Sequence, residues 1–195
     1  MRYTPEHQKE TRRAILAAAT KLFKEKGYTG VSIDAIADAA KLTSGALYSQ
    51  FASKQELFDA VLDAELAGAG QRWAQLQRGG KEALSAVLAA YLSMTHRGNV
   101  SSGCPVASLS VDAARCTKAI QRSYGQRLTE VVDELAKALG RSADPAAREP
   151  VWAFYALLVG GMVLARAVYD ESTASEILAS CRKCATEIAK TLVAT

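Results

Sequence analysis

Cysteine and histidine carry the most reactive side chains in this chain, and there are few of them. The 195 residues include four cysteines and two histidines. Cys181 and Cys184 have CxxC spacing, but a structural zinc site needs four ligands and the chain has no second close pair. The two histidines, His7 and His96, offer few groups for acid–base catalysis. The sequence shows no Ser/His/Asp arrangement and no cluster with the spacing of metal ligands. We therefore expect no enzyme, no metal and no cofactor.

Cys104 has a different setting from the CxxC pair. It stands directly before Pro105, and proline suits the first position of a helix. The dipole at a helix N-terminus favours thiolate over thiol, and the thiolate is the reactive form. Cys104 is therefore a candidate sensor thiol. The alternative is a buried cysteine that packs against the following helix.

A second group of residues is small or hydroxylic and opens a short helix expected at about residues 44–51. It consists of Thr43, Ser44, Gly45 and Ala46, with Tyr48 on the outer face. A short helix capped by Ser32 precedes it, after a break at Lys41-Leu42. Two short helices joined in this way have the geometry of a helix-turn-helix, whose second helix fits the major groove of DNA. The two short helices could instead be an ordinary connector between longer helices. Tyr48 could instead be a half-buried residue of the core.

The distribution of charge is consistent with that geometry. Residues 1–54 contain nine Lys and Arg against five Asp and Glu, whereas residues 55–195 contain fifteen of each. A basic module on a neutral body suggests a polyanion partner for the module alone. Lys54 opens the next helix, where its charge opposes the helix dipole, so a phosphate contact explains it better.

The elements that position these residues are helices. Apolar residues recur at helical spacing almost throughout, with no sustained alternation of period two, which predicts an all-α protein of about nine helices. We expect a three-helix DNA-binding module at 1–53 and a larger helical body at 54–195. One helix should run from residue 80 to about His96. Helix ends are predicted at Gly27 and Gly140, and helix starts at Ser53-x-x-Glu56, Asp144-Pro145 and Thr173-x-x-Glu176.

The longest uncharged apolar run, Val151 to Ala165, is too short to cross a bilayer. It predicts a buried helix in a soluble protein, with no membrane partner. No basic-then-apolar leader opens the sequence, so a cytoplasmic location is expected.

Several separate motifs in residues 11–62 resemble the TetR family of transcriptional regulators. They are TRRAILAAA from Thr11, Leu22-Phe23, GYTGVSIDAIA from Gly27, SGALYSQF from Ser44 and KQELF from Lys54. One difference is that Ser49-Gln50 occupy positions where the family often has histidine, which leaves the operator sequence open.

The resemblance implies a homodimer that binds a palindromic operator in double-stranded DNA and is more often a repressor than an activator. Each subunit would place its third helix in one half-site, with Thr43, Ser44, Gly45, Ala46 and Tyr48 facing DNA. The predicted contacts to the phosphates of the DNA backbone are Thr29, Ser32 and Lys54. Arg12 and Arg13, or the arm around Arg2, would add backbone or minor-groove contacts.

The resemblance also implies that residues 54–195 form a ligand-binding and dimerisation domain, with a pocket for a small-molecule inducer among its helices. The apolar candidates for its lining predict a largely hydrophobic inducer, although an aromatic stripe is more often simply core. They are Trp73, Tyr91, Met94, Tyr124, Phe154, Tyr155, Leu158 and Met162, with His96 as a polar contact. The segment GCPVASL from Gly103 resembles a subgroup of the family in which this cysteine senses electrophiles or oxidants.

The last two helices are the expected dimer interface. Ile177, Cys181, Cys184 and Ile188 recur at nearly heptad spacing, and Gly160-Gly161 would let another helix approach closely. The alternative is a pair of core helices inside a monomer. A rival of another class, an all-helical ligand carrier, would share the pocket but would not need the basic module.

Overall fold

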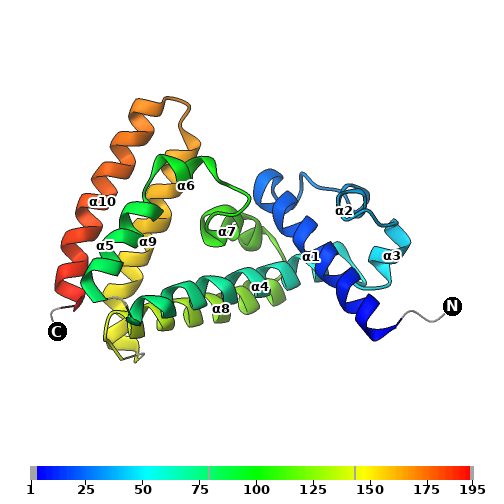
Figure 1. The fold of residues 1–195 in the computed structure, drawn as a ribbon, viewed down its shortest axis with the longest axis horizontal. Helices are drawn as coiled ribbons and strands as arrows, with labels where there is room; N and C mark the ends of the chain where they lie inside the picture. The colour runs from blue at the N-terminus through cyan, green and yellow to red at the C-terminus, as the bar shows by residue number, and fades with distance from the viewer. Residues whose placement is uncertain (1–3, 79, 143, 194–195) are drawn as a thin grey trace.

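The computed structural model describes residues 4–78, 80–142 and 144–193, and these contain ten α-helices, one 3-10 turn and no strand. Figure 1 shows their arrangement. The helices are α1 (Pro5–Lys26), α2 (Ile33–Ala39), α3 (Ser44–Tyr48), α4 (Lys54–Ala74), α5 (Gly80–Tyr91), α6 (Met94–Gly98), α7 (Pro105–Arg115), α8 (Lys118–Ala138), α9 (Pro145–Ala167) and α10 (Glu171–Val193), with the 3-10 turn η1 at Gln75–Arg78.

The N-terminal module, α1 to α3, begins and ends its helices at the predicted local signals. Gly27 ends α1 with a φ of 74°, a left-handed conformation that suits glycine. Ser32 and Thr43 cap α2 and α3, each by accepting a hydrogen bond from the backbone N–H three residues later. Ser53 caps α4 by accepting from the Glu56 N–H, as expected, and the Glu56 carboxylate accepts from the Ala52 N–H, one residue before the position that a capping box uses.

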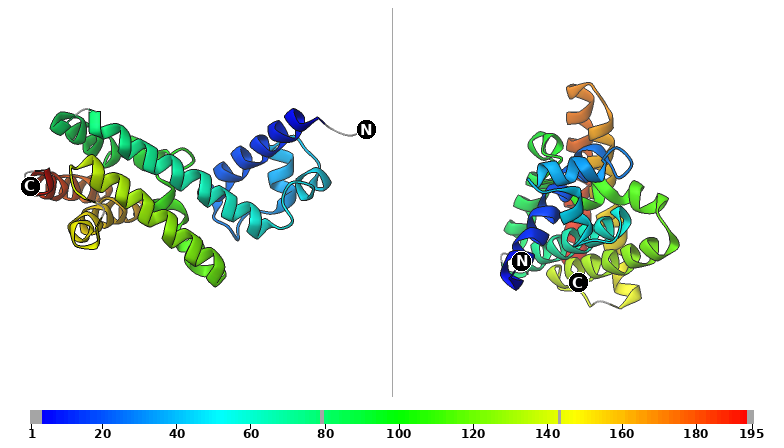
Figure 2. Two further views of the ribbon diagram at one scale, coloured as in Figure 1. Left: turned by 90° about the horizontal axis from the view of Figure 1, so that it is seen from below. Right: turned by 90° about the vertical axis from the view of Figure 1, so that its right-hand side faces the viewer.

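The body is a set of long helices packed in pairs. Helix α4 leaves the module and packs along α8, and α9 packs along α10. The module and the α9–α10 pair lie at opposite ends of the molecule, with α4 and α8 running between them (Figures 1 and 2). Helix α7 contacts α1, α4, α8 and α9 and so lies where the module meets the body.

Two hydrophobic cores correspond to the module and the body. The module's core includes Phe23, Ile36, Leu47 and Phe51, but it is completed by the first two turns of α4 as far as Leu62. Leu109 of α7, Ala113 of α7 and Ile120 of α8 also belong to it. The predicted boundary after residue 53 therefore marks where α4 begins, while the packing of the module continues through α4.

Three helix boundaries differ from the expectation. The single helix expected at 80 to about 96 is two helices, because Ser93 caps α6 by accepting from the His96 N–H and donating to the Ala90 carbonyl. Helix α3 ends at Tyr48 rather than Phe51. Helix α10 begins at Glu171, two residues before Thr173, because Asp170 accepts the Thr173 N–H and hydroxyl hydrogen bonds.

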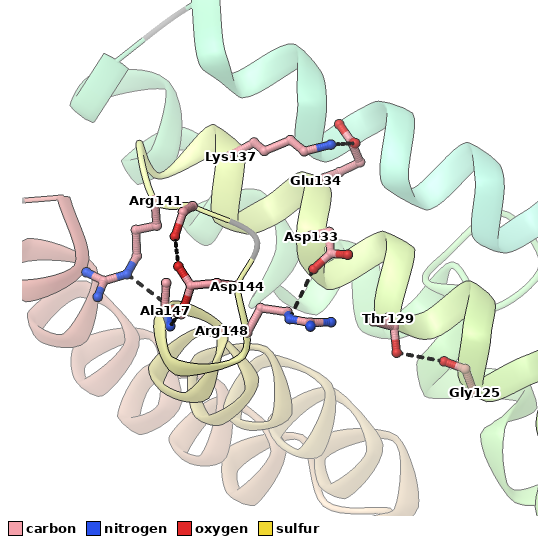
Figure 3. A network of polar contacts seen from close by, with 10 residues as sticks. Gly125, Thr129, Asp133, Glu134, Lys137, Arg141, Asp144, Ala147 and Arg148 are labelled. Carbon is pink, nitrogen blue, oxygen red and sulfur yellow. Dashed lines mark hydrogen bonds and ion pairs between the residues drawn. The ribbon is translucent and has the colours of Figure 1, made fainter.

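The corner between α8 and α9 is fixed by local polar contacts (Figure 3). Gly140, with a φ of 75°, ends α8, and the Arg141 N–H donates to the Ala136 carbonyl in a Schellman motif. Asp144 caps α9 by accepting from the Ala147 N–H at 2.9 Å. One turn further on, Arg148 pairs with Asp133 of α8 at 3.3 Å.

Helix α9 is long and apolar enough to cross a membrane by length and composition alone. In the structure its buried side packs against α8, α10, α7 and α6, with Phe154, Leu158 and Met162 fully covered. This buried side is that of a core helix, as the sequence predicts, but the helix has 23 residues and is longer than the apolar run Val151 to Ala165, so the expectation that this segment is too short to cross a bilayer was wrong.

Candidate nucleic-acid interface and ligand cavity

Helix α3 separates a buried face from an exposed one. Leu47 is fully buried, whereas the Tyr48 side chain is 53% exposed. The Thr43 hydroxyl accepts from the Ala46 N–H at 3.2 Å, and Gly45 is exposed beside it. The Ser44 hydroxyl donates to Asp34 of α2 at 2.5 Å, so it is already engaged within the module. Thr43 and Tyr48 are therefore the most available of the predicted groove residues.

The predicted phosphate contacts lie at the ends of neighbouring helices. Thr29 and Ser32 are exposed between α1 and α2. The Lys54 ammonium lies 4.4 Å from the centre of the Tyr28 ring, which brings the start of α4 next to the α1–α2 turn. Partial burial lowers the pKa of Lys54, while the nearby Asp112 carboxylate of α7 acts to raise it. Lys54 thus has intramolecular neighbours that its sequence position did not indicate.

Arg12 ties α1 to the residues that follow α3. Its guanidinium donates to the Gln50 carbonyl at 2.9 Å and lies 4.1 Å from the centre of the Phe51 ring. Arg13 is exposed on the same helix. Arg2, which was expected to add contacts from an N-terminal arm, lies outside the described residues.

A cavity of about 790 Å³ lies in the body, at a size that suits small organic ligands. Five of its lining residues were singled out from the sequence: Trp73, Tyr91, His96, Cys104 and Tyr155. Its other residues are Ala69, Arg72, Gln75, Val87, Ala90, Ser93, Thr95, Asn99, Ser102 and Gly103. The lining is thus more polar than predicted, because the break at Ser93 and the loop after α6 contribute hydroxyl, amide and backbone groups.

The remaining predicted ligand contacts do not line this cavity. Phe154, Leu158 and Met162 are fully buried in the core of the body, and Met94 and Tyr124 pack against that core. The Tyr124 hydroxyl is 2.6 Å from the Ser110 hydroxyl, with which it shares a hydrogen bond. An apolar residue on a helix stripe most often faces other helices, and these five do so.

His96 organises the inner end of the cavity. Its Nδ1 lies 2.6 Å from the Tyr91 carbonyl oxygen, and its Nε2 accepts from the Cys104 N–H at 3.0 Å. These two partners assign the neutral ring with the proton on Nδ1. Burial lowers the pKa of His96, as do the charges of Arg166, Arg72 and Lys24, while the hydrogen bond to the Tyr91 carbonyl acts to raise it.

Arg166 of α9 joins the helices around this end. Its guanidinium donates to the His96 and Arg97 carbonyls of α6 and to the Ser108 hydroxyl of α7. Burial lowers the pKa of Arg166, and the neighbouring Cys104 thiol and Tyr91 phenol act to raise it. All three of its hydrogen-bond partners are uncharged.

A buried lysine connects the cavity to the module. Lys24 of α1 donates to the Gly103 carbonyl at 3.0 Å and pairs with Glu65 of α4. Gly103 lines the cavity and is tightly enclosed, because a Cβ there would lie 2.5 Å from the Asn99 carbonyl oxygen. In the sequence, Lys24 is a lysine three residues before the helix end predicted at Gly27. No local signal pairs it with a residue 79 positions away.

The predicted dimer residues divide between the chain's own core and its surface. Gly161 packs against Cys181, since a Cβ on Gly161 would lie 2.8 Å from the Cys181 sulfur. Ile177 and Ile188 also pack against the core of the same chain. Gly160 has open space beside it, and Cys184 is exposed.

An apolar stripe remains uncovered on α9. It lies on the face that Gly160 shares, and its spacing of three and four residues is that of a helix-packing surface. Its exposed residues are Ala153, Ala156, Val163, Leu164 and Ala167, of which Leu164 is 58% exposed; Gly160 and Leu157 on the same face are half-buried, and Leu157 also packs against the core of its own chain.

The four cysteines are free thiols, and no group of three or more potential metal ligands occurs in the described part of the chain. Cys104 is buried at the N-cap of α7, and Cys116 and Cys181 are half-buried. Burial raises the pKa of Cys181, and Cys184 adds to this.

The arrangement defines an all-helical protein with an N-terminal helix-turn-helix module and a cavity-bearing body. The family model for bacterial regulatory proteins of the tetR family matches residues 15–61. The transcriptional regulator AcrR of Shigella flexneri is 36% identical over 70 residues, which are 36% of this chain and 33% of AcrR. The A-factor receptor protein of Streptomyces griseus is 43% identical over 54 residues, 28% of this chain and 20% of that protein.

Solved structures match the fold over most of the chain. The reduced form of NemR from E. coli has a TM-score of 0.75 and 21% identity, covering 91% of this chain and 95% of NemR. A TetR-family regulator from Agrobacterium tumefaciens has a TM-score of 0.73 and 20% identity, covering 91% of this chain and 98% of its own.

These comparisons confirm the resemblance found in the sequence: residues 15–61 match the tetR family of bacterial regulatory proteins, and the fold of the chain matches solved structures over most of its length. In sequence, the chain matches only about a third of the length of the first curated relatives. The sequence likeness therefore concerns the N-terminal module, and the likeness of the body is one of fold.

Proposed function

We propose that the protein is a homodimeric transcriptional repressor that binds a palindromic DNA operator and releases it when a small molecule occupies the cavity of the body. The match of residues 15–61 to the family model carries this proposal. The exposed groups at the start of α3 and the positive charge of residues 1–54 support it.

The groove contacts are assigned to Thr43, Ser44, Gly45, Ala46 and Tyr48. Because the Ser44 hydroxyl donates to Asp34, its lone pairs remain to accept from a base donor such as an amino group. Thr29, Ser32 and Lys54 are assigned to phosphates, where they position the module without reading sequence.

The dimer is assigned to the uncovered stripe on α9 together with the exposed side of α10. An exposed apolar face of this length is a typical interaction surface, and its small residues allow close approach of a second helix. In a C2 dimer the same stripe would meet its copy, which fits a palindromic site.

Release requires that the ligand bind the form without DNA better than the form with DNA, and linkage then makes DNA weaken ligand binding equally. The Gly103–Lys24–Glu65 contacts offer the physical route. A ligand that displaces Gly103 would disturb a lysine on α1 and its partner on α4, and both helices form the module's core.

Covalent sensing by Cys104 is a second candidate, since this thiol lines the cavity. An electrophile in the cavity would form a bond to the Cys104 sulfur while the thiol S–H bond breaks and its proton leaves to solvent. In that case Cys104→Ser should keep DNA affinity but lose release by electrophiles or peroxide. Release that persists in Cys104→Ser supports reversible binding instead.

Selection of bound duplexes from a random DNA pool tests the main proposal. The expected result is a palindromic sequence bound more tightly than random DNA, with a steep dependence on salt. If the selection enriches no sequence and the protein does not bind random duplex DNA either, the proposed function is contradicted.

A further inference from the structure

A single peptide group connects the cavity to the DNA-binding module. The Gly103 carbonyl and the Cys104 N–H belong to the same planar peptide unit. The N–H donates to Nε2 of His96 on α6 at 3.0 Å, and the carbonyl accepts from the ammonium of Lys24 on α1 at 3.0 Å. The peptide is therefore held by a cavity residue on one side and by the module on the other.

This peptide has little room to turn or to shift. A Cβ on Gly103 would lie 2.5 Å from the Asn99 carbonyl oxygen and 2.6 Å from the Arg166 guanidinium. Cys104 is also the N-cap of α7, which contacts α1 and α4 and whose buried face helps to complete the module's core (Figure 1). A displacement of the peptide would therefore reach the module by two routes, through the lysine on α1 and through α7.

The His96 ring can hold this peptide only in its neutral form. A backbone N–H can only donate, so Nε2 must present its lone pair to the Cys104 N–H, and the ring proton is then on Nδ1, 2.6 Å from the Tyr91 carbonyl oxygen. A proton that binds Nε2 takes up this lone pair and makes the ring a cation. Two N–H groups would then face each other across 3.0 Å, so the peptide would have to move away.

The groups around the ring add to the cost of charging it. Arg166 of α9, Arg72 of α4 and Lys24 of α1 act on the ring as positive charges. The carboxylate of Glu65 on α4 is already paired with Lys24. Burial lowers the pKa of His96, and the three cations lower it further, so the neutral ring is the form present near pH 7. The other titratable groups at this end of the cavity are the Tyr91 and Tyr155 phenols and the Cys104 thiol. None of the leading influences on the pKa of His96 comes from α10, which also contacts α6.

We propose that His96 is the positioning residue that couples the cavity to DNA binding: the neutral ring holds the Gly103–Cys104 peptide in the arrangement that binds operator, and a proton on Nε2 displaces this peptide and weakens operator binding. The inference adds a regulation to the proposed function and rests on it. Linkage then requires that bound operator disfavour protonation of His96, so operator binding in acid should release protons.

Fluorescence anisotropy titrations of the full chain with its selected operator test the dependence on protons. The Kd is measured at pH 7.5 and at pH 5.0, or at the lowest pH at which the circular dichroism spectrum is unchanged, with the same ionic strength throughout. Each protein is compared with itself through the ratio of the Kd in acid to the Kd at pH 7.5. For the wild type we expect a ratio of about five or more, the lower end of the usual range of allosteric coupling.

Two variants assign the proton, because the chain has two histidines. His96→Gln has an amide oxygen that can accept from the Cys104 N–H but cannot titrate, and its ratio should fall to about two or less. His7→Gln is the matched control, since His7 is an exposed histidine of α1 in the module. A proton on His7 would add positive charge to the module and strengthen binding to phosphates, so the control should keep the wild-type loss of affinity or increase it.

Calorimetry gives a second measurement that needs no variant at position 96. Operator titrations of the wild type at about pH 5.5, in two buffers of different ionisation enthalpy, should show a net release of protons. A wild-type ratio near one, equal ratios in the wild type and His96→Gln, or net uptake of protons overturns the inference. Operator binding that does not depend on pH refutes this inference alone. Absence of operator binding at pH 7.5 refutes the proposed function, and the inference falls with it.

Discussion

Lys24 is the side chain whose replacement should reveal most about the joint between module and body. It connects α1 to the Gly103 carbonyl at the cavity and to Glu65 of α4. Its side chain is 3% exposed and that of Glu65 is 24% exposed. Lys24→Met keeps an apolar side chain of similar length and removes the ammonium. The Gly103 carbonyl oxygen and the Glu65 carboxylate then lose their partner, and no new cavity forms.

The cost follows from what is left behind. Breaking a buried ion pair by removing one partner costs about 3–5 kcal/mol, because an uncompensated charge stays buried. Glu65 keeps some access to water, which places the expected loss near the lower end, at about 3 kcal/mol. For a chain of this length, each 1 kcal/mol lowers Tm by roughly 2–4 °C, so the decrease should be roughly 6–12 °C.

Thermal unfolding followed by circular dichroism at fixed protein concentration measures this change. Lys21→Met is the matched control, because Lys21 is an exposed lysine one turn earlier on α1. The control should shift Tm by less than about 2 °C, in line with surface substitutions. If Lys24→Met and Lys21→Met have the same Tm, the Lys24 contacts do not stabilise the joint between module and body. The proposed coupling of Gly103 to the module through Lys24 is then refuted as well.

Three further predictions concern DNA, assembly and pH. Lys54→Ala should weaken binding to operator and random duplex alike and reduce the slope of log affinity against log salt by about 0.9 for each phosphate that the protein no longer neutralises; an unchanged slope in fluorescence anisotropy titrations would remove Lys54 from the interface. Leu164→Glu should convert the dimer to monomers in sedimentation experiments and weaken operator binding, whereas Val111→Glu, at an exposed valine of α7, should leave the dimer intact; a wild-type protein that sediments as a monomer at micromolar concentration would refute the interface. Since the pKa of His96 in the folded protein lies below its unfolded value, the unfolded chain binds more protons in that interval, and stability should be full above about pH 6.5 and fall as the pH drops toward the folded pKa. Tm measured from pH 7.5 to 5.0 should show this loss of stability in the wild type and in His7→Gln, and less of it in His96→Gln. Equal profiles in all three proteins would show that His96 does not cause the loss.

Sequence predicted the helical fold and most helix boundaries in the module because those signals act over three or four residues. Ser32, Thr43, Ser53 and Asp144 each accept from a backbone N–H three positions later, a contact that depends on local geometry alone. Where two local signals competed, the prediction was wrong. Ser93 interrupts an apolar helical run, and Asp170 caps α10 ahead of the weaker signal at Thr173.

The candidate site was only partly predictable. Trp73, Tyr91, His96 and Tyr155 were found from their types and line the cavity, but Phe154, Leu158 and Met162 have equally suitable types and are core. Helical spacing shows which residues share a face, and it does not show whether that face meets another helix or a cavity. Cys181 illustrates the same ambiguity at the expected dimer seam, where it packs on Gly161 of its own chain.

The resemblance of the module to the tetR family and the module's helices were determined by the sequence itself, through ordered motifs and local caps in residues 11–62. Tertiary structure alone decided the contacts that connect the cavity to the module. Lys24 and Gly103 are 79 residues apart, and Arg166 lies about 70 residues from the carbonyls it binds. Such pairs have no spacing rule, because the helices that carry them meet only when the two hydrophobic cores have formed and brought α1, α6, α7 and α9 together.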